Sequence, residues 1–353
     1  MSKFLSKKFA SLVPYTPGEQ PKDRKFIKLN TNESPFPPSE KAKEGARKAA
    51  ESLMLYSDPE CTALHRAFAD VYGLRPSQVI ATNGSDEILN FAFMAFCDEE
   101  TPAAFADITY GFYKVFADLY GIEKKIIPLR DDFSIVPEDY FGLGATIFIA
   151  NPNAPTGIAL GRDEIEKILV ENPNNVVVID EAYVDFGAES CVPLIEKYDN
   201  LLVTMTFSKS RSMAGARLGF GMASEALIAD LMALKYSTNP YNVNSMTAAA
   251  GIGVLSDEEY TKKNCKTIAE NREFLLAELR ELGFEATDSL SNFIFTKHTS
   301  VAGEALYAAL REKGILVRHF ASDRISDYVR ITIGTREQCE ALLDAVREIL
   351  LET

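Results

Sequence analysis

The densest group of chemically reactive side chains in the sequence lies in residues 206–220. Among glycines that allow a close approach of the backbone, this stretch contains Ser208, Lys209, Arg211 and Arg217. A lysine amine can form a Schiff base with a carbonyl compound. An arginine can bind a phosphate or a carboxylate through two parallel hydrogen bonds. Most single lysines are solvated surface charges, so the group as a whole is more informative than any one member.

Three other stretches place polar side chains where a strand is expected to end. Residues 82–87 read TNGSDE, and the free N–H groups of a helix start with the Ser85 hydroxyl suit a phosphate. Simple helix capping explains the same pattern. Residues 151–157 read NPNAPTG, which is typical of a tight turn. Asp180 opens the DEAYVDF stretch, where an acid either caps a helix or pairs with a cation in a pocket.

Together, the four stretches supply what one cofactor, pyridoxal 5′-phosphate, requires. It needs a lysine for covalent attachment, an acid that keeps its pyridine nitrogen protonated, and a cradle for its phosphate. Lys209, Asp180 and Arg217 are the matching side chains, with nearby hydroxyls completing the cradle. A protonated ring accepts the electrons released when the Cα–H bond of the substrate breaks. Tyr110, which follows another predicted strand, is placed to stack on that ring.

The elements that must position these residues are short apolar strands that alternate with helices. Strand-like runs rich in branched residues occur at 79–81, 103–107, 125–129, 145–150, 176–180 and 201–207. Their continuous apolar character predicts an α/β fold with a largely parallel sheet covered by helices on both faces. Ligands of such sheets bind at the carboxyl ends of the strands, which is where the four stretches begin.

The sequence predicts three parts of the chain. Residues 1–29 are expected to form an extended N-terminal arm that packs on the C-terminal part or on a partner subunit. Residues 30–240 are expected to form the large cofactor-binding α/β domain. Residues 241–353 contain a predicted long helix at 257–283 and few strands, and are expected to form a smaller α/β domain. A helix is also predicted at 40–56.

Composition excludes several classes of protein. The net charge of -14 argues against a nucleic-acid partner. The longest apolar runs are too short to span a bilayer, and the N-terminus has no apolar core of a signal peptide. The five cysteines and three histidines are scattered without metal-ligand spacing. We therefore expect a cytoplasmic protein with reduced thiols, no metal, no membrane contact and small-molecule partners.

On these motifs, the sequence resembles the fold-type I, pyridoxal-phosphate-dependent aminotransferases and, among them, the histidinol-phosphate aminotransferases. The resemblance covers nearly the whole chain. The stretch 206-TFSKSRSMAGARLGF-220 is specific for the superfamily, whereas 28-KLNTNESPFPPS-39 and 328-YVRITIGT-335 point to the subfamily. It implies a mostly parallel, seven-stranded-type sheet and transamination between L-histidinol phosphate and 2-oxoglutarate in histidine biosynthesis.

The resemblance also implies roles for individual residues. Lys209 would be the Schiff-base lysine and proton shuttle, Asp180 the partner of the ring nitrogen, and Tyr183 a donor to the phenolic oxygen. Further cofactor contacts are implied for Ser85, Asp86, Tyr110, Asn153, Ser208 and Arg217. Tyr56 matches a tyrosine that reaches the cofactor phosphate of the partner subunit, which implies a homodimer with shared active sites. Arg330 would bind the glutamate carboxylate. Residues implied around the substrate phosphate are Tyr15, Asn32 and Arg318.

One position departs from the family's Asn-Pro-Thr-Gly pattern, because Ala154 stands before Pro155. Either Asn153 or a water replaces the missing asparagine, or Tyr183 makes the contact to the phenolic oxygen alone. Losing one hydrogen bond of ~1 kcal/mol would tune the cofactor rather than abolish its chemistry.

Two other functions fit the same scaffold: an aromatic or broad-specificity aminotransferase, and a threonine-phosphate decarboxylase. A nicotinamide-dependent oxidoreductase is disfavoured, because no G-x-G-x-x-G follows the first strand.

Overall fold

The fold is built around a seven-stranded mixed sheet. A computed structural model describes residues 2–10 and 12–352. Across the sheet the strands are β2 (Val79–Thr82), β8 (Gly219–Ala223), β7 (Leu201–Thr206), β6 (Val177–Asp180), β5 (Thr146–Ala150), β3 (Ala103–Ala106) and β4 (Lys124–Ile127). β8 is antiparallel to both of its neighbours, and the other adjacent pairs are parallel. The predicted α/β fold class is confirmed.

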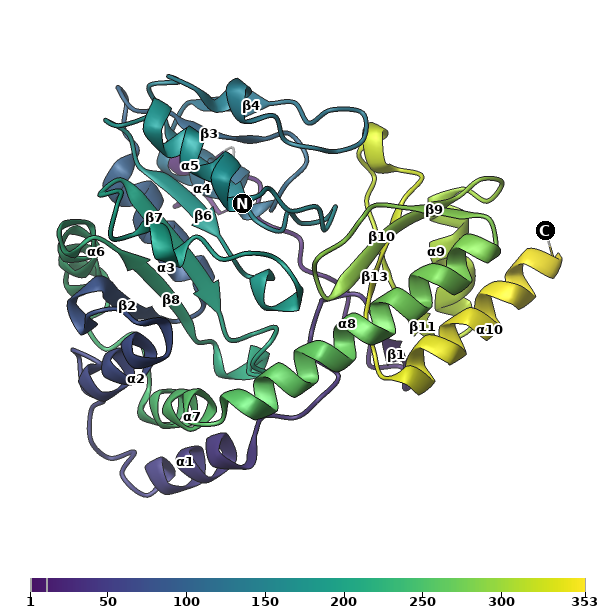
Figure 1. Ribbon diagram of the computed structural model, residues 1–353, viewed down its shortest axis with the longest axis horizontal. Helices are drawn as coiled ribbons and strands as arrows, with labels where there is room; N and C mark the ends of the chain where they lie inside the picture. Colours follow the sequence, from purple (N-terminus) through teal and green to yellow (C-terminus); the bar gives the residue numbers. More distant parts are fainter. Residues whose placement is uncertain (1, 11, 353) are drawn as a thin grey trace.

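Helices cover one face of this sheet with a continuous apolar core (Figure 1). Phe105, Phe148 and Val178 point to this face, because alternate residues of a strand point the same way. The covering helices are α3 (Ser85–Phe96), α4 (Phe112–Tyr120) and α6 (Glu225–Thr238).

A second core fills the opposite face, where Ile147, Ile149 and Ile179 are buried. The helices of this face are α2 (Thr62–Tyr72), α5 (Arg162–Glu171) and α7 (Ser245–Leu255), and α1 (Glu40–Ala50) packs on α7. Burial on both faces explains why the strands are continuously apolar in sequence.

The C-terminal part contains a second, antiparallel sheet of four strands. Their order is β12 (Arg318–His319), β13 (Val329–Thr332), β10 (Phe293–His298) and β9 (Phe284–Ala286). The long helix α8 (Glu258–Glu281) runs from α7 to this sheet, with α9 (Gly303–Glu312) and α10 (Arg336–Glu352) packed beside it (Figure 1). The three-part division of the chain made above stays a prediction.

The N-terminal segment is held against the C-terminal part. β1 (Ile27–Lys28) pairs in parallel with β11 (Ile315–Leu316). Further towards the N-terminus, the Glu19 carboxylate accepts hydrogen bonds from Tyr307 at 2.6 Å and from Arg311 at 3.1 Å. Residues 29–33 follow β1 directly, so the pairing of β1 with β11 holds their N-terminal end against the C-terminal part.

The helix predicted for residues 40–56 is shorter in the structure, because α1 ends at Ala50. The following turn leaves four large side chains in succession exposed, from Leu53 to Tyr56, which is 85% exposed. Tyr56 stacks on Tyr241 with 4.7 Å between ring centroids. Among the described residues, no helix has the length and apolarity needed to cross a membrane.

The start of α3 lies directly on β8, and glycine makes this contact possible. A Cβ atom on Gly219 would lie 2.5 Å from the carbonyl carbon of Gly84, the residue that precedes α3. Any larger residue at position 219 would therefore force α3 away from the sheet.

We expect Gly219→Ala to lower the free energy of unfolding by about 2 kcal/mol, as overpacking of a tight core contact does. Urea denaturation measures the change. Gly215→Ala is the matched control, since a Cβ atom there meets nothing within 4 Å. Equal stabilities of the two variants would contradict the prediction.

Candidate active site

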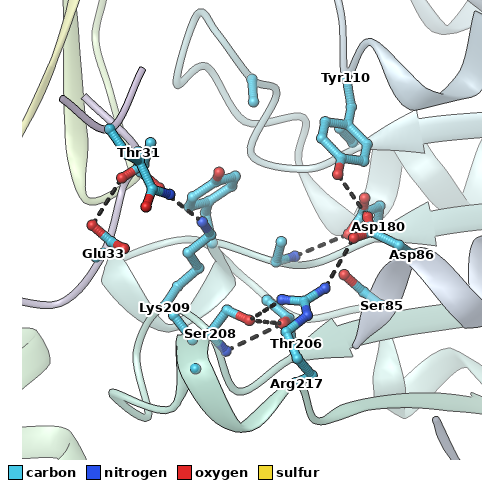
Figure 2. Close-up of a pocket in the computed structure, with 17 residues that line it drawn as sticks. Thr31, Glu33, Ser85, Asp86, Tyr110, Asp180, Thr206, Ser208, Lys209 and Arg217 are labelled. Carbon is cyan, nitrogen blue, oxygen red and sulfur yellow. Dashed lines mark hydrogen bonds and ion pairs between the residues drawn. The ribbon is translucent and has the colours of Figure 1, made fainter. Parts of the chain in front are cut away.

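A cavity of about 480 Å³ lies at the carboxyl ends of β5, β6 and β7 (Figure 2). Its walls include residues from all four predicted stretches: Ser85, Asp86, Ala154, Asp180, Tyr183, Ser208, Lys209 and Arg217. We call it the lysine cavity. Its volume is in the range of small-molecule sites. The parallel strands thus bring together residues that are far apart in the sequence.

Lys209 projects into this cavity from the loop after β7. Its Nζ donates a hydrogen bond to the carbonyl oxygen of Thr31 at 3.2 Å, and it lies 5.8 Å from the centre of the Tyr183 ring. Lys209 is therefore held between the N-terminal segment and the residues that follow β6.

Asp180 is the last residue of β6 and is almost fully buried. It accepts hydrogen bonds from Tyr113 and from the Ala182 N–H, both at 3.2 Å, and from Thr204 at 3.3 Å. Burial raises its pKa to about 6, although the Tyr113 hydrogen bond acts in the opposite direction. In the part of the chain that the structure describes, no lysine or arginine forms an ion pair with this carboxylate. A cation that binds beside a buried carboxylate of this kind stabilises its ionised form.

Hydroxyls and an arginine gather at the other end of the lysine cavity (Figure 2). Arg217 contacts Ser208 Oγ at 3.4 Å and pairs with Asp86 at 3.0 Å. The N-terminus of α3, at Ser85, faces the same space. A Cβ atom on Gly84 would lie 2.5 Å from the Arg217 guanidinium, so glycine leaves room for the arginine. Free N–H groups, hydroxyls and a guanidinium form a site for a phosphate.

Tyr110 lies on the side of the cavity opposite Lys209. Its hydroxyl donates to Asp86 at 2.6 Å, and its ring packs edge-on against Tyr113 at 5.7 Å. Burial raises the pKa of Tyr110 well above its usual value, so the phenol stays neutral. The ring is thereby fixed as one wall of the lysine cavity.

A second cavity of about 410 Å³ shares Lys209, Tyr110 and Tyr183 with the first. We call it the arginine cavity, because Arg318 and Arg330 line it. The two cavities meet at the lysine, so that a ligand in one can reach a group bound in the other.

Arg330 has an incomplete set of hydrogen bonds. One terminal nitrogen donates to the Asn30 carbonyl at 3.1 Å, while its buried Nε has no partner within the described residues. The guanidinium lies over the rings of Phe293 and Phe320, at 5.2 and 5.7 Å. Burial lowers the pKa of Arg330. A desolvated cation with a free donor is a strong site for a small anion.

Arg318 and Tyr15 lie at the outer side of the arginine cavity. Arg318 donates to the carbonyl oxygens of Thr16 and Pro17, both at 3.4 Å, and its guanidinium lies 5.7 Å from the centre of the Phe320 ring. Tyr15 stacks on Phe112 with 4.3 Å between centroids. Both side chains line the arginine cavity, and their contact with a substrate phosphate stays a prediction.

Two predicted site residues lie elsewhere. Asn153 does not line either cavity: its amide donates to the Ile108 carbonyl at 2.9 Å and to Thr156 at 3.1 Å, and its oxygen accepts from Thr109. In the structure these contacts occupy its amide, so the cofactor contact expected of Asn153, in place of the asparagine missing at position 154, stays a prediction. Tyr56 lies on the exposed surface of the chain and lines neither cavity.

A third residue, Asn32, lines the arginine cavity, but both ends of its amide are used within the protein, by Tyr183 and Thr332. This pairing fixes the direction of the amide and leaves at most one of its two N–H bonds for a substrate phosphate. The direct phosphate contact expected of Asn32 stays a prediction.

The structure adds residues that the sequence analysis did not single out. Gln20 and Thr31 line both cavities, and Tyr113 bonds to Asp180. Tyr113 could have been recognised because it lies one helical turn after Tyr110. The contact of the Thr31 carbonyl could not have been recognised, because a backbone contact does not depend on the residue type.

Glu181, next to Asp180, is a buried acid that faces away from the cavity. Its carboxylate accepts hydrogen bonds from the Ser190 hydroxyl, at 2.6 Å, and from the Cys191 N–H. Burial raises its pKa to about 7, despite these two donors. Glu181 ties the segment that carries Asp180 and Tyr183 to residues 190–191.

Between about pH 4.5 and 7 the folded protein should therefore bind more protons at Glu181 than the unfolded chain does, so stability falls as pH rises. We expect Glu181→Gln to flatten this fall by up to ~1.4 kcal/mol per pH unit. Urea denaturation at several pH values measures how the free energy of unfolding changes with pH. Glu171→Gln, at an exposed position, is the control, and an unchanged slope in Glu181→Gln would refute the assignment.

Comparison with known proteins agrees with this geometry. The family model "Aminotransferase class I and II" matches residues 24–346. A histidinol-phosphate aminotransferase of Brachyspira hyodysenteriae is 48% identical over 352 residues, 99% of each chain. One of Marinomonas sp. is 50% identical over 353 residues, which is 99% of this chain and 100% of the relative.

Among solved structures, a putative histidinol-phosphate aminotransferase from Erwinia carotovora atroseptica superposes with a TM-score of 0.86 at 26% identity. The match covers 93% of this chain and 96% of the other. The predicted resemblance is confirmed, and the chain belongs to the aminotransferase class I and II family.

Proposed function

We propose that this protein is a pyridoxal-phosphate-dependent aminotransferase that transfers an amino group between L-histidinol phosphate and 2-oxoglutarate, in histidine biosynthesis. The observation that carries the proposal is the pair of cavities that share Lys209, one with Asp180 and a phosphate site, the other with two arginines. The relatives of nearly half-identical sequence, which are named histidinol-phosphate aminotransferases, support the choice of substrate.

The residues of the lysine cavity fit the cofactor. Lys209 would attach it covalently through Nζ, and Asp180 would pair with the ring nitrogen, a cation that relieves its unpartnered burial. The phosphate would lie between Ser208, Arg217 and the start of α3, and the Tyr110 ring would cover one ring face. When bound, the cofactor supplies an electron sink for the bond that breaks at the substrate Cα.

Binding of the cofactor phosphate would change the contacts of Arg217. Its ion pair with Asp86 at 3.0 Å occupies a donor that the phosphate needs. Asp86 would keep its hydrogen bond to Tyr110 and contribute its backbone N–H to the phosphate. The side chain of Asp86 thereby fixes the ring that covers the cofactor.

Lys209 is also the group placed to move a proton at the substrate Cα. Its Nζ lies where the two cavities meet and, as a free amine, would take the proton from the substrate Cα. The carbonyl of Thr31, at 3.2 Å from Nζ in this structure, is an acceptor that can orient the amine.

The arginine cavity would hold the anionic groups of both substrates. Arg330, with its unsatisfied Nε, would bind the carboxylate of glutamate or 2-oxoglutarate. Arg318, whose hydrogen bonds to the carbonyl oxygens of Thr16 and Pro17 are long at 3.4 Å, would turn towards the phosphate of L-histidinol phosphate. A guanidinium pairs with either anion in a bidentate manner, so one pocket can serve both half-reactions.

The proposal extends to a cytoplasmic homodimer with shared active sites. All five cysteines are buried and free, as expected for a reducing compartment. The succession of exposed apolar side chains from Leu53 to Tyr56 offers a surface for a second copy of the chain, and Tyr56 would reach the cofactor phosphate of that copy.

Donor specificity tests the proposal directly. We expect purified protein to show a visible absorption band from the lysine-bound cofactor, and L-histidinol phosphate to convert it with the highest kcat/KM among three candidates, the others being phenylalanine and threonine phosphate. The control, Lys209→Ala, should lack the band and lose turnover by roughly 10³-fold or more. A preference for phenylalanine would indicate an aromatic aminotransferase, and CO₂ release from threonine phosphate would indicate a decarboxylase.

Mixing two inactive variants tests the shared site. Lys209→Ala lacks the lysine of its own site, and Tyr56→Ala lacks the tyrosine of its partner's site, so a mixed dimer keeps one complete site. We expect unfolding and refolding of an equimolar mixture to restore about a quarter of the wild-type activity per chain, because half of the random dimers are mixed. The absence of any gain over the separate variants would exclude a site shared through Tyr56.

A further inference from the structure

Asn32 occupies a strained and fully enclosed position beside the site. It is 1% exposed and has a φ of 56°, in the left-handed region that asparagine tolerates better than most residues. The segment before it pairs with the C-terminal part through β1, and its own carbonyl accepts from Asn292 at 2.9 Å. This position is fixed by the fold rather than by a ligand.

The hydrogen bonds of Asn32 determine which way its amide is turned. Its backbone N–H donates to Thr332 Oγ at 3.0 Å, and the Thr332 hydroxyl lies 3.0 Å from Asn32 Oδ1. Since Thr332 Oγ receives the N–H, its own hydrogen is free for Oδ1. The amide oxygen thus faces Thr332, and the amide nitrogen faces Tyr183, to whose oxygen it donates at 2.9 Å.

This arrangement fixes the hydroxyl hydrogen of Tyr183. Its oxygen accepts from Asn32, and an amide N–H offers no acceptor in return, so the hydroxyl hydrogen must point elsewhere. Tyr183 lines both cavities, and the side chain at position 154, across from it, is an alanine without a donor. The free direction of the O–H bond is towards the space in which the cofactor ring would lie.

We infer that Asn32 is a positioning residue that, through Thr332 on one side and Tyr183 on the other, directs the Tyr183 hydroxyl hydrogen onto the phenolic oxygen of the cofactor. The inference rests on the proposed function, because it needs a bound cofactor. It gives Asn32 a role different from the substrate-phosphate contact expected from the sequence.

The same short segment also contacts two of the cationic side chains that line the cavities, Arg330 and Lys209. The carbonyl of Asn30 accepts from Arg330, and the carbonyl of Thr31 accepts from Lys209. Glu33 lines the lysine cavity, where its carboxylate accepts from Thr31 Oγ at 2.8 Å. The charged groups that line the two cavities together with Tyr183 are Glu33, Asp86, Asp180, Lys209, Arg217, Arg318 and Arg330, and the variants below leave all seven in place.

The pH midpoint of the visible absorption band of the bound cofactor reports this hydrogen bond. A donor to the phenolic oxygen stabilises its ionised form and so lowers the pKa of the neighbouring lysine–cofactor linkage. We expect Tyr183→Phe to raise the midpoint most, and Asn32→Ala to raise it by about 0.5–1 pH unit, the size of one hydrogen bond. Asn32→Asp should shift it further than Asn32→Ala, since a carboxylate accepts the Tyr183 hydrogen and draws it out of the cavity.

Thr332→Val provides a second route to the same result, because it removes the hydroxyl that turns the Asn32 amide. It should raise the midpoint in the same direction even if Asn32 variants fold poorly. Asn30→Ala is the matched control, an asparagine of the same segment whose amide bonds to the Glu19 carbonyl and not to Tyr183; it should leave the midpoint unchanged.

Two outcomes would overturn the inference. One is a wild-type midpoint in Asn32→Ala and Thr332→Val while Tyr183→Phe is shifted; the other is an equal shift in Asn30→Ala. A wild-type protein without any visible band after incubation with pyridoxal phosphate would instead overturn the proposed function itself.

Discussion

The burial of Asp180 is the constraint on which the rest of the site depends. A carboxylate at the end of a central strand, held by three neutral donors at 3.2 to 3.3 Å, gives up much of its solvation. Its pKa of about 6 expresses that cost. A cationic ring nitrogen would offset that cost, so the burial that raises the pKa of Asp180 would strengthen the binding of a protonated ring. The remaining residues would place that ring.

Three features of the cavity would hold the ring in place. The loop after β7 brings Lys209 to one side of the cavity, and Tyr110, fixed by Asp86, closes the other. The start of α3 can approach β8 because Gly219 has no side chain, and this approach puts free N–H groups beside Arg217. Backbone geometry, rather than the strength of any single side-chain contact, therefore sets the shape of the phosphate site.

Much of the large sheet and several residues of the candidate site could be predicted from the sequence. Continuous apolar runs located six of the seven strands of the large sheet, because strands buried on both faces have no polar alternation. β8 was not predicted, because it contains glycines in place of the branched residues that are typical of a strand. Lys209, Asp180 and Arg217 stood out by residue type and position. The hydrogen-bond partners of Asn153 and Asn32 could not be predicted, because the partner of an amide depends on which side of the turn it faces, and only the fold decides that.

The contacts of the segment from Asn30 to Asn32 suggest why the N-terminal segment belongs to the site. Its successive carbonyls accept from Arg330, Lys209 and Asn292, so one short stretch of backbone contacts the arginine cavity, the lysine cavity and the residue before β10. The backbone bends at Asn30 and Thr31 and has a positive φ at Asn32, so these carbonyls point in different directions. A substrate anion that draws Arg330 from the Asn30 carbonyl would act on the same backbone that holds Lys209. The hydrogen bond of Arg330 in the arginine cavity and that of Lys209 in the lysine cavity are thus linked through the backbone of residues 30–32.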